Sequence, residues 1–178
     1  MGDIVTMDDL TNQEIVAVLD DAERLVPVAR GDVYLPLLQG KVLANMFFEN
    51  STRTRMSFET AMKRLGGSVL NFTSIGTSVA KGETLYDTMQ MIDGYADVAA
   101  IRHPRQGAAQ YSADAVEIPI LNAGDGAGNH PTQTMLDLFT IRQAHGTLEG
   151  LNVVLVGDLR YGRTVHSLSH ALVRFGAK

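Results

Sequence analysis

The chain has 178 residues, 45% of them hydrophobic and 20% charged, and its formal net charge is −5. This balance is typical of a globular protein and argues against a disordered chain or a basic nucleic-acid coat, so any anion site must be local and preorganised. Cysteine is absent, which excludes disulfides and thiolate chemistry, and no apolar run approaches the about 20 residues of a membrane span.

The first ten residues, MGDIVTMDDL, are acidic and lack the apolar core of a signal peptide, so we expect a cytoplasmic protein. Segment 10–26 opens with Thr11 and Glu14, the spacing of a capping box, and continues with apolar residues at helical intervals. Further along we predict strands at 41–48, 68–72, 97–101, 117–124 and 151–158. They alternate with helices from about 51 to Gly66-Gly67 and at 82–95, 105–115, 130–146 and 162–178.

Strand–helix alternation at this rhythm predicts an α/β fold, a parallel sheet flanked by helices on both faces. The sequence HGTLEG at 145–150 marks a seam between the long helix and the next strand. Beyond it, one strand–helix unit is too little to bury a second core. We therefore expect one domain at 1–146, including the linking helix, and the start of a truncated second α/β domain at 147–178.

Anion-seeking side chains follow the first predicted strand, in the stretch STRTR at 51–55. A helix N-terminus offers unpaired N–H groups and the positive end of the macrodipole, to which hydroxyls and a guanidinium add donors for phosphate. Arg53 and Arg55 lie two positions apart, about 200° around a helix, so only one can face a ligand at the helix tip. We expect the other to pair with a carboxylate such as Glu49 or Glu59. Simple capping by the serine is the alternative, but it leaves the neighbouring threonine and arginine unexplained.

Two later predicted strands end in further polar residues. Arg102 follows 97–101, and the glycine-rich turn after 117–124 delivers His130 and Gln133 to one face of the next helix. Because the carboxyl ends of parallel strands share one sheet edge, these side chains should meet the stretch at 51–55. His130 is then a candidate to polarise a carbonyl, although taken alone it would be read as a capping or core histidine.

Three other patterns resemble cofactor or metal motifs, but each lacks a residue that such a site requires. GDLRYGRT at 157–164 has P-loop spacing, but Arg163 replaces the lysine that reaches the phosphates. The glycines at 124–128 lack the third glycine and the spacing of a dinucleotide fingerprint. His166 and His170 have metal-ligand spacing without an evident third ligand. We therefore predict no metal and no cofactor.

Four stretches carry a resemblance to the transcarbamoylase family. FFENSTRTRMSFE at 47–59 and HPTQTMLDLFTI at 130–141 resemble motifs shared by aspartate and ornithine carbamoyltransferases. SVAKGETLYDT at 78–88 and VGDLRYGRTVHSL at 156–168 are similar to the aspartate carbamoyltransferase catalytic chain in particular. The resemblance covers nearly the whole chain. It implies a carbamoyl-phosphate-binding domain followed by an aspartate-binding one, and transfer of the carbamoyl group to aspartate in pyrimidine biosynthesis.

The resemblance also implies roles for individual residues. Thr54, Arg102 and His130 would stabilise the oxyanion as the amine of aspartate attacks, and Gln133 would fix the carbamoyl NH₂. Arg163 would meet a carboxylate of aspartate. The full set implied for carbamoyl phosphate is Ser51, Thr52, Arg53, Thr54, Arg102, His130, Gln133, Ser78 and Lys81, with Lys81 and Arg163 for aspartate.

Family members donate residues such as Ser78 and Lys81 to a neighbouring subunit, so the resemblance implies a homotrimer with shared active sites, and possible regulatory chains. The loop is one residue shorter than in some members, which makes the placement of Ser78 weaker than that of Lys81. Two alternatives stay open: an ornithine carbamoyltransferase, and an isolated carbamoyl-phosphate-binding trimerisation module without turnover.

Overall fold

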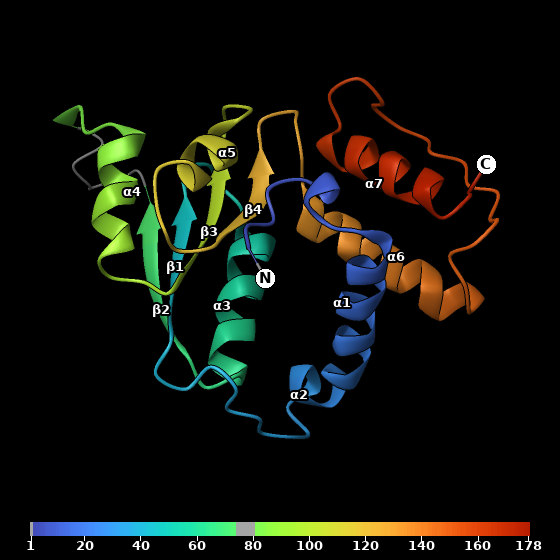
Figure 1. The fold of residues 1–178 in the computed structure, drawn as a ribbon, viewed down its shortest axis with the longest axis horizontal. Coiled ribbons are helices and arrows are strands. Elements are labelled where there is room, and N and C mark those ends of the chain that lie inside the picture. The colour runs from blue at the N-terminus through green and yellow to red at the C-terminus, as the bar shows by residue number, and fades with distance from the viewer. Residues whose placement is uncertain (1, 74–80) are drawn as a thin grey trace.

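The computed structural model describes residues 2–73 and 81–178. In these residues the strands β1 (Val42–Phe47), β2 (Ser68–Thr73), β3 (Val98–His103) and β4 (Ile120–Asp125) form one sheet in the order β2-β1-β3-β4. All the strand pairs are parallel, as Figure 1 shows. The predicted parallel sheet is therefore confirmed, and the strand order places β1 and β3 at its centre.

Helices cover both faces of the sheet, as the alternation of strand side chains requires. Ala44, Met46 and Ile101 face α4 (Leu85–Asp93) and α5 (Ala108–Ala113) in one apolar cluster. Leu43 and Ala100 face the opposite way and pack with α3 (Thr52–Arg64). The central strands β1 and β3 are thus buried on both sides, which is typical of a parallel sheet.

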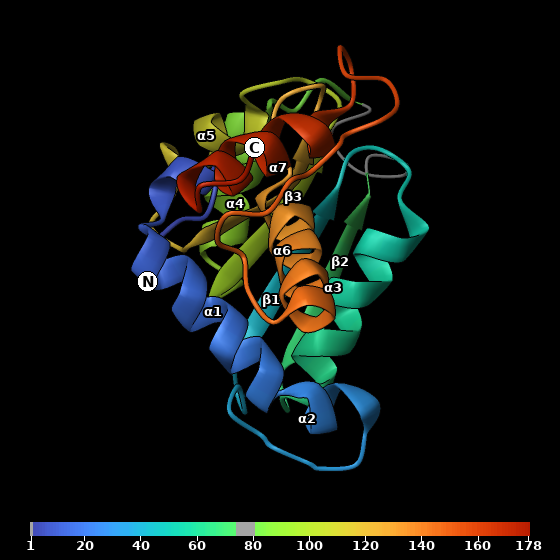
Figure 2. The ribbon, with the colours of Figure 1, turned by 90° about the vertical axis from the view of Figure 1, so that its right-hand side faces the viewer.

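A third apolar cluster lies beside β4. It joins the short 3₁₀ helix η1 (Met7–Asp9) to α1 (Asn12–Arg24), α6 (Pro131–His145) and α7 (Arg163–Arg174). Its buried residues include Leu19 of α1, Leu138 of α6 and Leu172 of α7. Figures 1 and 2 show α7, drawn in red, lying against α6. Helix α7 is therefore held against the same body as the sheet.

Local sequence explains several element boundaries. Thr11 and Glu14 form the expected capping box at the start of α1. Gly66, at φ +83°, follows α3 in the left-handed conformation that favours glycine, and the chain leaves the helix there. Ile4 exchanges backbone bonds with Ile120 and Asn122 of β4, so the N-terminal segment covers this edge of the sheet.

One predicted element is wrong. Residues 151–158 form no strand, and Val154 and Val156 are 85% and 89% exposed. Among the described residues, its backbone hydrogen bonds join Leu151 and Val153 to Lys178, and Asp158 to Gly162 in a turn. An apolar run becomes a strand only beside a partner strand, and in the described residues this run has none, although Val153 packs partly against the cluster of α1, α6 and α7. The structure also contains two elements that were not predicted, η1 and the short helix α2 (Val26–Arg30).

Candidate functional site

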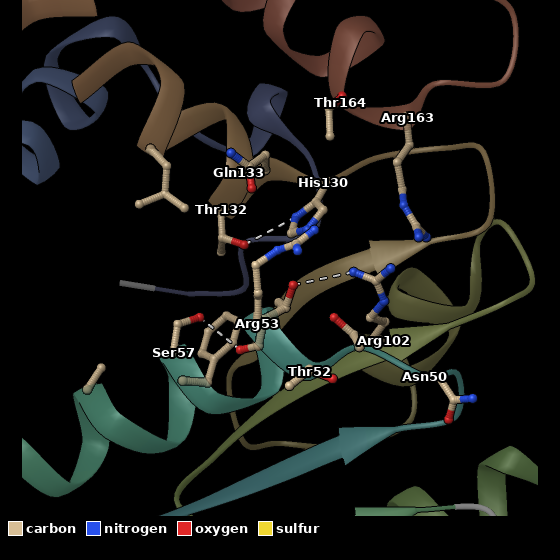
Figure 3. Close-up of a pocket in the computed structure, with 15 residues that line it drawn as sticks. Asn50, Thr52, Arg53, Ser57, Arg102, His130, Thr132, Gln133, Arg163 and Thr164 are labelled. Atoms are coloured by element: carbon tan, nitrogen blue, oxygen red, sulfur yellow. Dashed lines mark hydrogen bonds between the residues drawn. The ribbon is translucent and has the colours of Figure 1, made fainter. Parts of the chain in front are cut away.

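A cleft of about 820 Å³ lies where the carboxyl ends of the central strands meet three helix N-termini (Figure 3). It is open rather than enclosed, and most of the residues that line it have polar side chains. The first turns of α3, α6 and α7 each contribute, and Arg102 comes from β3. Its lining consists of Asn50, Ser51, Thr52, Arg53, Thr54, Ser57, Phe58, Ala61, Arg102, His130, Thr132, Gln133, Leu136, Arg163 and Thr164.

The N-terminus of α3 is prepared for an anion. Ser51 is the N-cap in an extended conformation, and its side chain makes no capping bond in the described structure. The first turn also contains no acidic residue. Figure 3 shows Arg53 directed from this turn into the cleft. Within residues 2–73 and 81–178, neither Arg53 nor Arg55 forms a salt bridge, so the N–H groups and the Arg53 guanidinium converge without an internal carboxylate.

Glu49 occupies a position that the sequence did not reveal. Its Oε1 lies 2.6 Å from Arg102 Nε and 2.8 Å from Arg163 Nη2. The prediction that Glu49 pairs with Arg53 or Arg55 is therefore wrong. Burial would raise the pKa of Glu49, but the hydrogen bonds and charges of the two arginines outweigh it and hold the pKa below its usual value. Its position directly after β1 was the signal that could have placed it at this sheet edge.

The two arginines are fixed by further bonds. Arg163 Nη1 donates to the carbonyl of Gly126 at 3.0 Å. Arg102 Nη1 lies 3.4 Å from the carbonyl of Ala123 and 3.5 Å from Thr54 Oγ1. Burial lowers the pKa of Arg102, as does the charge of Arg163, while Glu49 opposes both. An arginine nevertheless stays protonated, so this part of the cleft carries two fixed cations around one carboxylate.

Glu59, the other expected partner, lies outside this cluster. It accepts from Lys63 at 2.6 Å and from Asn71 at 3.0 Å. The charge of Arg55 contributes only weakly to lowering its pKa. The expected Glu59–Arg55 ion pair is therefore replaced by a pair within α3.

His130 is the N-cap residue of α6 and only 5% exposed. Its backbone N–H donates to Ser167 Oγ at 3.1 Å, and its ring Nδ1 lies 3.3 Å from Thr132 Oγ1. Burial, and then the charges of Arg102 and Arg163, lower the pKa of His130 to about 4. The imidazole is therefore neutral near pH 7, with one nitrogen able to donate to an oxygen in the cleft.

Gln133 lies on the same face of α6, one turn from His130. Its Nε2 donates to Asp137 Oδ1 at 3.0 Å, which orients the amide. Burial raises the pKa of Asp137, while this bond from Gln133 opposes the rise. The amide oxygen of Gln133 can then accept from an N–H of a ligand.

The cleft brings together most of the residues proposed from the sequence: Ser51, Thr52, Arg53, Thr54, Arg102, His130, Gln133 and Arg163. Lys81 is exposed and is not part of its lining. Ser78 lies outside the described residues. Thr132 and Leu136 were missed, although both belong to the HPTQTML stretch and face the cleft from α6.

Comparison with known proteins gives consistent matches. Residues 2–143 match a protein-family model described as "Aspartate/ornithine carbamoyltransferase, carbamoyl-P binding domain". The aspartate carbamoyltransferase catalytic subunit of Archaeoglobus fulgidus is 53% identical over 176 residues, 98% of this chain and 59% of that protein. A second archaeal catalytic subunit, from Methanothermobacter thermautotrophicus, is 53% identical over 98% of this chain and 56% of its own length.

Solved structures of aspartate transcarbamoylases also resemble this chain. Aspartate transcarbamoylase from Trypanosoma cruzi, in complex with carbamoyl aspartate and phosphate, superimposes with a TM-score of 0.95 at 45% identity. The match covers 99% of this chain and 57% of that one. The catalytic subunit of M. jannaschii aspartate transcarbamoylase gives a TM-score of 0.91 at 50% identity, covering 98% of this chain and 57% of that one. The chain therefore spans between 56% and 59% of the length of these relatives.

Proposed function

The chain belongs to the aspartate/ornithine carbamoyltransferase family, and we propose that it carries the carbamoyl-phosphate half of an aspartate carbamoyltransferase. The complete enzyme would transfer the carbamoyl group from carbamoyl phosphate to L-aspartate, giving N-carbamoyl-L-aspartate and phosphate, in de novo pyrimidine biosynthesis. The observation that carries this proposal is the convergence of the uncapped α3 N-terminus with Arg53, Arg102 and His130 in one cleft.

The phosphate would lie at the tip of α3, within reach of the first-turn N–H groups. Ser51, Thr52 and Thr54 would add hydroxyl donors, and Arg53 a planar pair of donors. Arg102 lies at the edge of this proposed phosphate site, 3.5 Å from the hydroxyl of Thr54. It can therefore contact both a phosphate oxygen and the neighbouring carbonyl oxygen of the substrate.

Carbamoyl transfer then needs little from the protein beyond position and charge. The amine of aspartate attacks the carbamoyl carbon, a C–N bond forms, and the bond from this carbon to the phosphate oxygen breaks. The proton lost by the amine leaves with the phosphate. Arg102, Thr54 and the neutral imidazole of His130 would stabilise the oxyanion, and Gln133 would hold the carbamoyl NH₂. We propose no cofactor, because carbamoyl phosphate is already an activated mixed anhydride.

The aspartate side of the reaction is represented by Arg163. Its Nη2 donates to the Glu49 carboxylate at 2.8 Å. We propose that Arg163 binds a carboxylate of aspartate in the complete enzyme, together with Lys81. Residues 1–146 would form the first domain and 147–178 the start of the second.

We further propose a homotrimer, in which Ser78 and Lys81 reach the cleft of a neighbouring copy, with regulatory chains as possible partners. The exposure of Lys81 outside its own cleft is compatible with this arrangement. In the described residues no helix has the length and apolar character needed to cross a membrane. A cytoplasmic location is part of the proposal.

Calorimetry with carbamoyl phosphate tests the binding half of the proposal. We expect the chain to bind carbamoyl phosphate more tightly than inorganic phosphate, because the carbonyl and amino groups add contacts to Arg102, His130 and Gln133. Equal affinity for the two anions, or no binding, would count against it. An assay with aspartate and ornithine as acceptors tests the proposed transfer to aspartate, in a version that carries the proposed aspartate-binding domain.

A second candidate follows from the lining of the cleft, which gathers most of the residues proposed for carbamoyl phosphate but, of the two proposed for aspartate, only Arg163. On this alternative the chain binds carbamoyl phosphate and trimerises without turning over. Binding without formation of carbamoyl aspartate by the isolated chain would support it.

A further inference from the structure

Asp125 is a buried carboxylate that the proposed reaction does not use. It ends β4 and is only 3% exposed. Its Oδ2 accepts from the backbone N–H of Gly107 at 2.7 Å, and its Oδ1 accepts from the N–H of Asn129 at 2.9 Å and from Asn122 Nδ2 at 3.2 Å. All of these partners, within the part of the chain that the structure describes, are neutral donors. A buried charge held only by neutral N–H groups is costly to place in the interior.

The three donors come from three separate segments. Asn122 belongs to β4, Gly107 to the connection before α5, and Asn129 to the loop that leads from β4 into α6. Asp125 thus joins the start of this loop to its end. A backbone hydrogen bond joins the same two residues, because the N–H of Asp125 donates to the carbonyl of Asn129 at 3.2 Å.

The loop is compact around the carboxylate. A methyl group added at Gly128 would lie 3.0 Å from Asp125 Oδ1 and 2.8 Å from Gln106 Cγ. One added at Gly126, whose φ is +51°, would lie 2.7 Å from the backbone nitrogen of Gln106. Only glycine fits Gly126 without strain, because both its conformation and its neighbour exclude a side chain.

Both ends of this loop reach the cleft. The carbonyl of Gly126 accepts from Arg163, and the residue after Asn129 is His130, whose N–H is held by Ser167. A shift of the loop would therefore move an oxyanion donor and the anchor of an aspartate-binding arginine together.

The charge of Asp125 also acts on His130. Burial lowers the pKa of this histidine, and Arg102 and Arg163 lower it further, whereas Glu49 and Asp125 oppose them. Asp125 is thus one of two carboxylates whose charge acts on the pKa of His130, and it is the one on the same loop.

We propose that Asp125 is a positioning residue of the transfer site: its carboxylate fixes the loop that places His130 and the carbonyl that holds Arg163. That this positioning serves carbamoyl transfer rests on the proposed function. The position of His130 itself can be measured whether or not carbamoyl phosphate binds.

The test compares Asp125→Asn with Asp93→Asn in the same chain. Asp93 is a matched control, because its Oδ1 also accepts from two backbone N–H groups, those of Glu117 at 3.0 Å and Ile118 at 3.1 Å, away from the cleft. Two readouts are taken at pH 7: the ring ¹⁵N and ¹³C resonances of His130, and calorimetric affinity for a phosphonate mimic of carbamoyl phosphate.

We expect Asp125→Asn to displace the His130 resonances and to weaken binding by about tenfold, whereas Asp93→Asn changes neither. Unchanged His130 resonances in folded Asp125→Asn would overturn the proposal. If the unchanged protein binds no mimic, the proposed function fails, but the resonances still decide the role of Asp125. If Asp125→Asn does not fold, Gly128→Ala replaces it, since the added methyl presses on the carboxylate while keeping its charge. Displaced resonances there support the proposal, and unchanged ones overturn it.

Discussion

Arg163 reaches Glu49 across 114 residues of sequence, its Nη2 lying 2.8 Å from the carboxylate oxygen Oε1. The same oxygen lies 2.6 Å from Nε of Arg102. One carboxylate therefore links two residues that line the cleft, Arg163 of α7 and Arg102 of the central strand β3. In the structure it holds two cations that the proposed reaction needs for substrate.

Replacing Glu49 with Gln should destabilise the fold while sparing anion binding. Glutamine keeps the shape but loses the charge, so two partly buried guanidinium groups lose a charged acceptor. We expect the free energy of unfolding to fall by about 1–3 kcal/mol in urea titrations. Glu23→Gln, which removes an exposed partner of Arg142, is the control and should cost under about 0.5 kcal/mol. Equal losses of unfolding free energy in the two variants would contradict this stabilising role of Glu49. A loss of carbamoyl-phosphate affinity in Glu49→Gln would contradict it as well.

Arg53 and Arg55 should differ sharply in anion binding. Arg53 lines the cleft and Arg55 does not. We expect Arg53→Ala to weaken carbamoyl-phosphate binding by about 30-fold in calorimetry, because a charge-assisted contact to phosphate is lost. Arg55→Ala should change the affinity by less than about threefold. A larger loss in Arg55→Ala than in Arg53→Ala would show that the other arginine faces the ligand.

His130 should make the fold sensitive to mild acid. Its pKa in the folded chain is about 4, below the ordinary value of 6.5. Between these values the unfolded chain binds a proton that the folded chain does not, so the free energy of unfolding falls as the pH falls. The contribution is at most about 3 kcal/mol.

Urea titrations of the wild type and His130→Asn between pH 7 and pH 4 measure this effect. The difference in unfolding free energy between the two should shrink as the pH falls through this window. Comparing the two proteins removes the contribution of His103, whose pKa is also lowered by burial and by the charge of Arg105. Glu49, with a lowered carboxylate pKa, acts in the same direction only below its ordinary value of 4.5. Parallel pH profiles would refute the assignment to His130.

His130 should also affect turnover more than binding. In a version that carries the proposed aspartate-binding domain, we expect His130→Ala to lower kcat by about 100-fold, since losing one oxyanion donor costs about 3 kcal/mol in the transition state. Carbamoyl phosphate should still bind within about threefold of the wild-type affinity, because the α3 tip is intact. Steady-state kinetics and calorimetry measure the two quantities. An unchanged kcat would remove His130 from the mechanism.

The sequence predicted the parts of the site that depend on local chemistry. The stretch from Ser51 to Thr54 follows a buried strand and opens a helix, and His130 and Gln133 do the same on α6, so the rule of strand ends was enough to bring them together. Glu49 could not be assigned in this way. Its choice of Arg102 and Arg163 over Arg53 and Arg55 depends on how distant segments pack, which spacing along the chain does not encode.

The incorrect strand at 151–158 has a related cause. The run LNVVLVGD has the composition of a buried parallel strand, and at β1 a similar run was predicted correctly. The difference lies in the neighbours: Leu43 and Met46 of β1 lie between two strands and two helix layers, whereas Val154 and Val156 are exposed. Composition predicts a strand only where the rest of the fold supplies partners.

The pairing of Ile4 with β4 has a practical consequence for anyone producing this protein. Ile4 donates to the carbonyl of Ile120 at 2.8 Å and accepts from the N–H of Asn122 at 2.9 Å, while Val5 is buried. An affinity tag fused at the amino end therefore needs a flexible spacer, and a cleavage site must leave this short stretch whole. Removing residues up to Val5 would expose unpaired backbone N–H and C=O groups along β4. We expect such a protein to precipitate when it is concentrated, because these groups can pair with other molecules.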